Sequence, residues 1–316
     1  MSSCIVIPVH NRRATTLACL HVLKSQGVLD WAKVIVVDDG SSDGTADAIR
    51  TEFPQIVILT GDGNLWWGRA INLGMQWAFE QGAESVLWLN DDTHPHPGTL
   101  GQLVKLSRER QAITTAQSKL RETGELHYGG LRKTNSGTEF ISCPPGEIGV
   151  CDTFCGNCVC IPRIAFERVG LIDTARFPHF AGDADYGLRA KEAGVLRLIA
   201  GDALCDCSYG SAKNRQSWLL GDQSITDLWG GCFHPYNGIL SRCGTRFRLR
   251  HWGWRGLVWL IASLSRLIVI TAVRFLIPRR FLLRLAAHRN STHVRMQAVQ
   301  RWEVNQIESA KSSSLP

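Results

Sequence analysis

The stretch Val86-Leu87-Trp88-Leu89-Asn90-Asp91-Asp92-Thr93 is the most informative part of the chain, because a short apolar run ends on two adjacent carboxylates. Such a run predicts a strand buried on both faces of a sheet. Ionised carboxylates at the end of a buried strand are costly unless they are paired or bind a metal ion. Hard oxygen ligands suit Mg²⁺ or Mn²⁺ held together with a phosphorylated substrate. Two interpretations stay open, a divalent cation site and a solvated acidic turn.

Upstream of this stretch, the chain alternates between expected strands and helices. Buried strands are expected at 4–9, 34–37, 56–59 and 85–89. Helices are expected at about 14–26 and 69–80, and the acidic, glycine-rich segment 38–45 opens another. This order predicts a parallel sheet covered by helices on both faces. Ligands of such sheets bind at the carboxyl ends of the strands, where His10, Asp39 and Asp92 fall.

Five segments in order resemble family 2 glycosyltransferases of the GT-A fold, and within that family the rhamnosyltransferases. They are Ile7–Arg12, Val37–Thr45, Gly63–Gly74, Leu89–Asp92, and the acceptor-side segment Gly156–Arg163 followed by Gly182–Arg189. The resemblance covers about residues 3–212. It implies an α/β domain at 1–227, with a Rossmann-like, mostly parallel sheet between helices. Residues 1–110 would bind the nucleotide sugar and 111–227 the acceptor.

The resemblance also implies which residues bind the donor. They are Pro8, Val9, His10, Arg12, Asp39, Asn64, Arg69, Asn72 and Asp91. Asp39 would bind the nucleobase and Arg12 would approach the diphosphate. Arg69 at a helix start would suit a pyrophosphate. Trp66 and Trp67 are equally compatible with packing and with sugar contacts.

Asp92 would bind Mn²⁺ or Mg²⁺ with the support of Asp91, and the metal would neutralise charge on the departing nucleoside diphosphate. Asp183 would be the general base that removes the proton of the acceptor hydroxyl. A single in-line displacement inverts the anomeric configuration. Asp185 is expected to have a structural role instead, as a helix cap or in a salt bridge with Arg189.

The chain departs from the family pattern at two places. Gly182 stands where many relatives carry glutamate, and the stretch 205–211 lacks the histidine that many place before a Gly-Ser pair. The third metal ligand would then be Asp206, Cys207, His179 or water. These departures keep open a catalytically silent nucleotide-sugar-binding protein. A nucleotidyltransferase is a further alternative, although 8–11 lacks the glycine-rich, basic first turn that a triphosphate needs.

The eleven cysteines allow another interpretation, a zinc cluster formed by Cys151, Cys155, Cys158 and Cys160. Paired Cys-x-x-Cys hooks are absent, and the strand-like run 158–161 favours thiols buried as small apolar groups. No signal peptide is expected before the first strand, which predicts reduced thiols and a cytoplasmic location.

The C-terminal part of the chain is strongly basic. Residues 228–302 hold thirteen Arg and no Asp, Glu or Lys. Since the whole chain carries +7 and residues 303–316 carry −1, the first 227 residues carry about −5. This asymmetry predicts an anionic partner for the segment 228–308, followed by a solvated tail at 309–316.

Within that segment, residues 252–278 are largely apolar, but Arg255, Ser263, Arg266 and Arg274 fall in one arc of a helix. This pattern favours a helix in the interface of an anionic membrane. Packing on the catalytic domain and a membrane span are alternatives, the span being costly for two central arginines. Nucleic acid is disfavoured because the arginines interleave with aliphatic runs.

Together, these features predict an inverting, metal-dependent glycosyltransferase that is peripheral on the inner face of the cell membrane. Its donor would be a UDP- or dTDP-sugar, and its acceptor a lipid-linked saccharide of a cell-surface polysaccharide. Rhamnose is compatible with this prediction, but no residue identifies the sugar.

Overall fold

The computed structural model describes residues 3–121, 123–207, 219, 223–234, 238–278 and 281. These residues fall into two compact units, one drawn from 1–213 and 232–260 and the other from 214–231 and 261–316. The expected tail at 309–316 and most of 279–308 lie outside the described residues.

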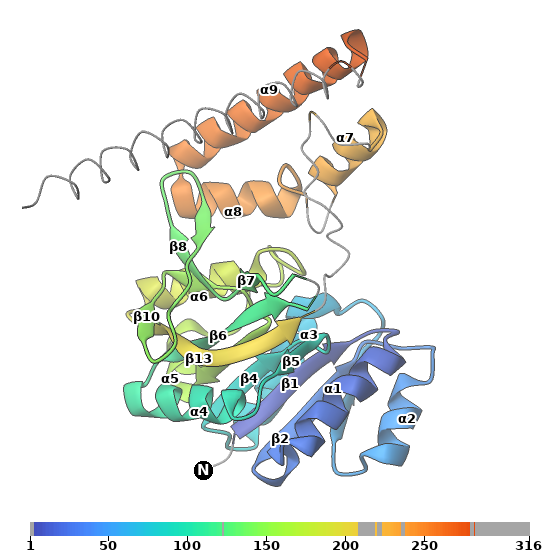
Figure 1. Cartoon of the computed structure of the whole chain (residues 1–316), viewed down its shortest axis with the longest axis vertical. Coiled ribbons are helices and arrows are strands. Elements are labelled where there is room, and N and C mark those ends of the chain that lie inside the picture. Colours follow the sequence, from blue (N-terminus) through green and yellow to red (C-terminus); the bar gives the residue numbers. More distant parts are fainter. Residues whose placement is uncertain are drawn as a thin grey trace, which may run out of the picture. The chain divides into compact units, whose positions relative to one another are not determined.

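The first unit is built on a mixed sheet (Figure 1). Its strands are β1 (Ser3–Val9), β2 (Ala32–Asp38), β3 (Val57–Thr60), β4 (Ser85–Leu89), β5 (Thr93–Pro95), β6 (Ile113–Leu120), β7 (Leu126–Tyr128), β10 (Ile148–Val150), β12 (Cys158–Pro162) and β13 (Arg197–Cys207). The main order is β10-β13-β6-β12-β4-β1-β2-β3. Strands β3, β2, β1 and β4 run parallel, which confirms the prediction from the N-terminal segments. A small sheet joins β8 (Gly130–Lys133), β9 (Thr138–Phe140) and β11 (Thr153–Phe154).

Strand β12 departs from the parallel pattern in the middle of the sheet. It pairs antiparallel with both β4 and β6. The last long strand, β13, again runs parallel to β6. The sheet is therefore mostly parallel on the N-terminal side and mixed on the other.

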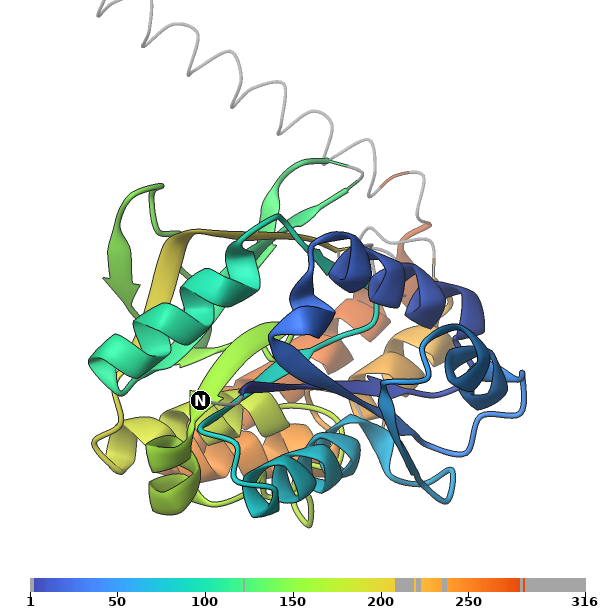
Figure 2. The same ribbon diagram turned by 90° about the horizontal axis from the view of Figure 1, so that it is seen from below.

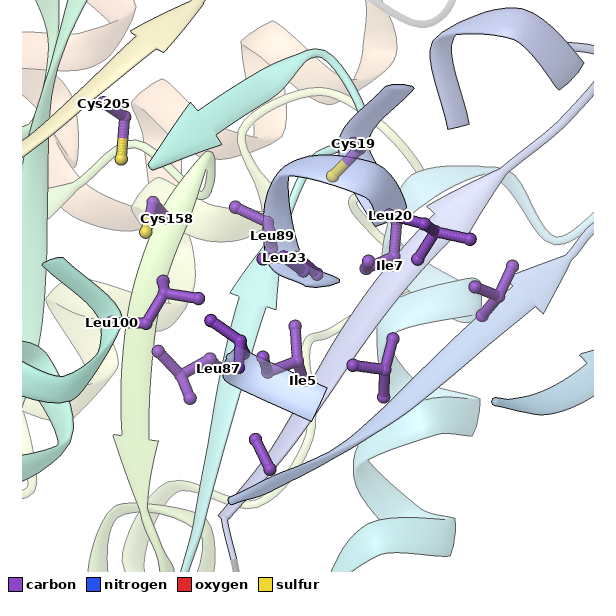
Figure 3. Close-up of a cluster of buried hydrophobic side chains, with 14 of the residues drawn as sticks. Ile5, Ile7, Cys19, Leu20, Leu23, Leu87, Leu89, Leu100, Cys158 and Cys205 are labelled. Carbon is purple, nitrogen blue, oxygen red and sulfur yellow. The ribbon is translucent and has the colours of Figure 1, made fainter. Parts of the chain in front are cut away.

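Helices cover both faces of the sheet. They are α1 (Arg13–Ser25), α2 (Thr45–Glu52), α3 (Trp66–Glu80), α4 (Thr99–Arg110), α5 (Arg163–Val169) and α6 (Gly182–Glu192), with a short 3-10 turn at Val28–Asp30. Alternate residues of each strand point to opposite faces. Ile5 and Ile7 therefore pack with Leu20 and Leu23 of α1 on one face (Figure 3).

The opposite face of the sheet packs against α3, α5 and α6. Val6 and Trp88 lie in this second core with Ile71 of α3. Figure 2 shows α1 and α4 on one side of the sheet and α3 on the other. Helix α3 approaches β1 closely because it carries Gly74, where an added Cβ would lie 2.4 Å from Val6 Cγ1.

Three helices are described beyond β13, namely α7 (Ile225–Phe233), α8 (Arg242–Trp252) and α9 (Trp254–Leu276). Helix α8 begins at an N-cap, Ser241, whose Oγ accepts the N–H of Gly244 at 3.1 Å. Its Phe247 packs against Phe177 in a small core of the first unit. Within the described residues, α9 is the one helix that is long and apolar enough to cross a membrane, by length and composition only.

Candidate functional site

The candidate site lies at the carboxyl ends of β1, β2 and β4. Because β1 pairs with both other strands, the residues that follow them come together. His10 Nδ1 lies 2.6 Å from the carbonyl oxygen of Asp39. Arg12 Nη2 lies 3.0 Å from Asp92 Oδ2, and its Nε lies 3.3 Å from Asp91 Oδ2. The sequence therefore predicts correctly that these side chains share one edge of the sheet.

The two adjacent aspartates have different surroundings. Asp91 is buried and accepts a hydrogen bond from Thr16 Oγ1 at 3.1 Å. Burial raises the pKa of Asp91 to about 6, and Asp92 adds to this, while the Arg12 guanidinium opposes the rise. The side chain of Asp92 is 19% exposed, against 3% for Asp91. Asp92 is thus the carboxylate that a ligand can contact, and Asp91 holds Arg12 in place.

A metal at this edge would have few protein ligands. Among the described residues, no group of three or more His, Cys, Asp and Glu side chains could hold a metal ion. Mg²⁺ accepts one or two carboxylates together with phosphate oxygens and water, and Asp92 fits such a set.

Two of the candidates for a third ligand, Asp206 and Cys207, are engaged elsewhere. Asp206 Oδ1 lies 3.1 Å from His96 Nε2. The Cys207 thiol donates to the carbonyl oxygen of Lys119 at 3.3 Å. His179 packs edge-on against Trp66, with ring centroids 5.6 Å apart. Residues 208–211, where many relatives place a histidine, lie outside the described residues.

Asp39 has a structural role that the sequence does not predict. Its Oδ1 accepts the N–H of Gly63 at 2.8 Å, and its Oδ2 accepts the N–H of Trp66 at 3.0 Å. Trp66 has a left-handed backbone with φ 56°, which costs on the order of 1–3 kcal/mol. Asp39 therefore fixes the turn that starts α3. Carboxylate oxygens accept more than one hydrogen bond, so the nucleobase contact stays a prediction.

The other residues predicted to bind the donor lie on and before α3. Asn64 is exposed, and its carbonyl oxygen accepts from Arg69 Nη1 at 3.3 Å. Asn72 is buried, and its amide exchanges two hydrogen bonds with the backbone of Ile172, at 2.9 and 3.0 Å. Both polar atoms of the Asn72 side chain are thus engaged inside the fold. Asn72 holds the segment before α6, and any effect on the donor would be indirect.

Asp183 lies in the first turn of α6. Its Oδ2 accepts the N–H of Gly156 at 2.7 Å, and its Oδ1 accepts the N–H of Ala184 at 2.8 Å. Burial raises the pKa of Asp183, while these N–H groups and nearby His179 lower it. Raising a carboxyl pKa towards the working pH makes it a stronger base for an acceptor hydroxyl.

Trp67 lies between the strand end that carries Asp91 and Asp92 and the helix start that carries Asp183. Its Nε1 donates to Asn90 Oδ1 at 2.8 Å, next to Asp91. Its ring lies against Gly156, where an added Cβ would be 2.6 Å from Trp67 Cζ2 and 3.1 Å from Asp183 Cβ. Trp67 therefore packs inside the domain, whereas Trp66 is 41% exposed.

Asp185 has the structural role that the sequence predicts. It is fully buried, and its Oδ2 lies 2.8 Å from Arg189 Nε. Two residues of α8 also contact its Oδ1, His251 Nε2 at 2.8 Å and Arg250 Nη1 at 3.3 Å. The predicted salt bridge with Arg189 is confirmed, and the contacts with α8 were missed because they join distant parts of the chain.

The zinc interpretation is wrong for Cys151, Cys155, Cys158 and Cys160, all of which the structure describes. Cys158 and Cys160 lie in the core beside α1, whereas Cys151 belongs to a separate cluster. Burial raises the pKa of both Cys151 and Cys155 to about 12. All eleven cysteines are unbridged.

Residues 4–170, more than half of the chain, match the family model described as Glycosyl transferase family 2. Two similar proteins are N-acetylglucosaminyl-diphospho-decaprenol L-rhamnosyltransferases of Mycobacterium tuberculosis strains CDC 1551 / Oshkosh and ATCC 25618 / H37Rv. Each is 22% identical over 227 residues, which cover 62% of this chain and 73% of the relative. The family match favours a glycosyltransferase over the nucleotidyltransferase alternative.

Two solved structures are similar in fold. One is GalNAc-T7 with UDP, GalNAc and Mn²⁺, with a TM-score of 0.57 and 15% identity over 81% of this chain. This chain spans only 56% of the GalNAc-T7 chain. The other is the mannosyltransferase PcManGT from Pyrobaculum calidifontis in complex with GDP-Man and Mn²⁺, with a TM-score of 0.53 and 14% identity, covering 90% of this chain and 79% of that one. Both confirm the predicted GT-A fold.

Proposed function

The chain belongs to glycosyl transferase family 2, and from this premise we propose that it transfers a sugar, with inversion, from a nucleoside diphosphate to a hydroxyl of a lipid-linked saccharide. The observation that carries the proposal is the chain of contacts Asn90–Trp67–Gly156–Asp183, which connects the strand end bearing Asp92 to the proposed base. This packing would hold a donor at one end and an acceptor at the other in a fixed relative position.

The donor would bind at the strand ends. Asp39 and His10, with Pro8 and Val9 of β1 beside them, would hold the nucleobase, for which uridine or thymidine is favoured. Arg12 is 44% exposed and already contacts Asp92, so it can donate to a diphosphate.

Asp92 would hold Mn²⁺ or Mg²⁺ together with the diphosphate of the donor. When bound, the cation supplies positive charge that stabilises the leaving diphosphate. Asp91 keeps the guanidinium of Arg12 at the same edge, 3.3 Å from its own carboxylate.

Asp183 would accept the proton of the acceptor hydroxyl as that oxygen attacks the anomeric carbon. The N–H groups of Gly156 and Ala184 hold the carboxylate in a fixed orientation. Positioned bases of this kind contribute about 10²–10⁴-fold to the rate.

A lipid-linked acceptor is supported by two features. The relatives from Mycobacterium tuberculosis are named as acting on a diphospho-decaprenol saccharide. In addition, helix α9 exposes an apolar stripe at helical spacing. Its members are Trp254, Leu257, Val258, Ile261, Leu264, Ile268, Val269, Phe275 and Leu276.

With Arg255 and Arg266 exposed beside this stripe, α9 has the composition of a helix that lies in an anionic membrane interface. The protein would then be peripheral on the cytoplasmic face of the cell membrane, next to its lipid-linked acceptor.

The transferase proposal is tested with purified protein, Mn²⁺ and a panel of nucleotide sugars, by following release of nucleoside diphosphate with and without lipid-linked acceptors. One donor should react, and Asp92→Ala and Asp183→Asn should each lower the rate about 10²-fold or more. Asp47→Asn, at an exposed carboxylate of α2, is the matched control and should react like the wild type.

An unchanged rate in Asp92→Ala would refute the metal assignment. Donor binding without turnover on any acceptor would instead favour the catalytically silent protein.

The membrane proposal is tested by flotation with vesicles that contain phosphatidylglycerol. Val258→Glu places a charge on the apolar stripe and should reduce binding by about tenfold or more, because burying a charge in the interface is costly. Val150→Glu, at an equally exposed valine of β10, is the control. Equal loss in both variants would contradict an attachment through α9.

A further inference from the structure

A cavity of about 540 Å³ lies in the first unit, between the β8–β9 hairpin and the junction of α8 and α9. Figure 1 shows β8 beside α8. The residues that line the cavity are Lys133, Thr134, Asn135, His251, Trp252 and Arg255. Trp252 fixes the hairpin against α8, because its Nε1 donates to the carbonyl oxygen of Thr134 at 2.7 Å. A cavity of this size is typical of a site for a small molecule.

The walls of the cavity carry positive charge without a counter-ion. Among the described residues, neither Lys133 nor Arg255 has a carboxylate within ion-pair distance. Lys133 Nζ lies 5.1 Å from the centre of the Trp252 ring, and Arg255 Nη1 donates to Asn135 Oδ1 at 3.2 Å. Asp152, whose carboxylate accepts the backbone N–H of Lys133, forms its ion pair with Lys191.

A third cation, Arg248, also lies close to the indole ring of Trp252. The guanidinium of Arg248 lies 5.2 Å from the centre of the Trp252 ring and 3.7 Å from that of Trp259. Burial lowers the pKa of Arg248. Lys133 and Arg248 both lie against the Trp252 ring and repel each other, so the arrangement is favourable when an anion binds near them.

His251, which also lines the cavity, has a buried ring nitrogen without a partner among the described residues. Its side chain is 1% exposed, and its Nε2 is bonded to Asp185 at 2.8 Å. The other ring nitrogen, Nδ1, is buried and has no hydrogen-bond partner within the described residues. A buried polar atom without a partner costs about 1–3 kcal/mol, and a phosphate in the cavity would supply the missing partner of Nδ1.

We propose that this cavity binds a phosphate ester. Lys133 and Arg255 would donate to the phosphate oxygens, as charge-assisted hydrogen bonds are the usual means of holding such groups, and His251 Nδ1 would hydrogen-bond to the same group. The junction with α9 leads to Trp254, which is 72% exposed at the start of the apolar stripe. A phosphate that belongs to a lipid could therefore enter the cavity while its chain contacts Trp254 and Leu257 of the same unit.

Two kinds of molecule would present such a phosphate ester, the lipid-linked acceptor with its diphosphate and an anionic phospholipid with its headgroup. The first rests on the proposed function. It gains support from the bond between His251 and Asp185, because Asp185 lies two residues from Asp183 on α6.

The site is tested by calorimetric titration of the full-length protein with inorganic pyrophosphate, in buffer with EDTA to suppress metal-dependent binding at the donor site. Lys133→Gln and Arg255→Gln should each weaken binding about tenfold, which equals about 1.4 kcal/mol. The matched control is Arg132→Gln, which removes an exposed charge from the neighbouring residue of β8 and should change the affinity less than about twofold.

Absence of pyrophosphate binding to the wild type would overturn the proposal. So would an equal loss in Arg132→Gln, since this would indicate unspecific attraction to a basic surface. Both results are independent of turnover, so the transferase proposal is not at stake in them.

The source of the phosphate is then identified by comparing two soluble esters, geranyl diphosphate and glycerophosphoglycerol. Tighter binding of the diphosphate, lost in Lys133→Gln, supports the acceptor as the source. Tighter binding of the phosphodiester, lost in the same variant, supports a phospholipid headgroup. If neither ester responds to Lys133→Gln or Arg255→Gln, the cavity is not a phosphate site.

Discussion

Asp183 and Asp185 lie two residues apart on α6, and replacing each by asparagine should separate chemistry from stability. Asp185 is fully buried and carries two short ionic contacts, to Arg189 and to His251, both at 2.8 Å. Within the described part of the chain, the Asp183 carboxylate accepts hydrogen bonds only from the backbone N–H groups of Gly156 and Ala184. The same substitution therefore removes an ion-pair partner at one position and a proposed base at the other.

The magnitudes follow from these contacts. Removing one member of a buried ion pair costs about 3–5 kcal/mol. Arg189 keeps hydrogen bonds to the carbonyl oxygens of Val169 and Leu171, so Asp185→Asn should cost the lower value, about 3 kcal/mol. For a domain of this size, that equals a fall in melting temperature of about 6–12 °C.

Asp183→Asn involves two opposing effects on stability. It loses one of two acceptor oxygens, but it also removes a charge that burial disfavours. Its melting temperature should therefore stay within about 3 °C of the wild type. Its rate of sugar transfer should fall about 10²–10⁴-fold.

Melting temperatures from differential scanning calorimetry and rates of nucleoside diphosphate release are measured on the same preparations. Together they test the structural role of Asp185 and the catalytic role of Asp183. If Asp185→Asn melts within 2 °C of the wild type, the buried ionic network does not stabilise the fold as we infer. If Asp183→Asn keeps more than about a tenth of the rate, Asp183 is not the general base.

Three further predictions concern the same domain. Burial raises the pKa of Asp183 above 3.8, so the folded state binds its proton more tightly than the unfolded state, and the wild type loses stability as pH rises through the folded pKa. The melting temperature of Asp183→Asn, relative to the wild type, should hence increase from pH 4 to pH 8, and a difference independent of pH would contradict this. Gly74→Ala should cost about 1–3 kcal/mol in chemical denaturation, because the new Cβ lies 2.4 Å from Val6 Cγ1, and Val6→Ala in the same chain should recover part of that loss. If the losses of unfolding free energy of the two single variants simply add in the double variant, the new Cβ does not clash with Val6. Asp39→Asn leaves the N–H of Gly63 or Trp66 without an acceptor, costs about 1–3 kcal/mol, and should speed proteolysis at 61–66; unchanged cleavage would show that Asp39 does not hold this turn.

The strands near the N-terminus could be predicted because their apolar runs are short and end on polar residues. β1, β2 and β4 lie where the sequence indicates, and β4 has the expected bounds. The direction of β12 could not be predicted. All of Cys158–Pro162 is buried, so its side chains have the same pattern whichever way the strand runs. Its antiparallel pairing with β4 depends on the path of the preceding chain.

In the candidate site, contacts between residues close in the sequence could likewise be predicted, and contacts between distant residues could not. The bond between Asp185 and Arg189 follows from their spacing on one helix. The bond from His251 to Asp185 joins residues 66 apart, and no local pattern indicates it. Asn72 is similar, because its partner Ile172 is 100 residues away.

The adjacent carboxylates of Asp91 and Asp92 would let one strand end both hold Arg12 and bind a cation. In the turn between β4 and β5, Asp91 is buried against Thr16 while Asp92 stays partly exposed. Arg12 bridges both and leaves the edge with one net negative charge. We infer that an arriving diphosphate would compete with Asp92 for Arg12, which would free the Asp92 carboxylate for a cation at the moment the phosphates supply the remaining oxygens. Donor and cation would then bind together more tightly than either binds alone, a coupling that Arg12→Gln should weaken in titrations of Mn²⁺ with and without the donor.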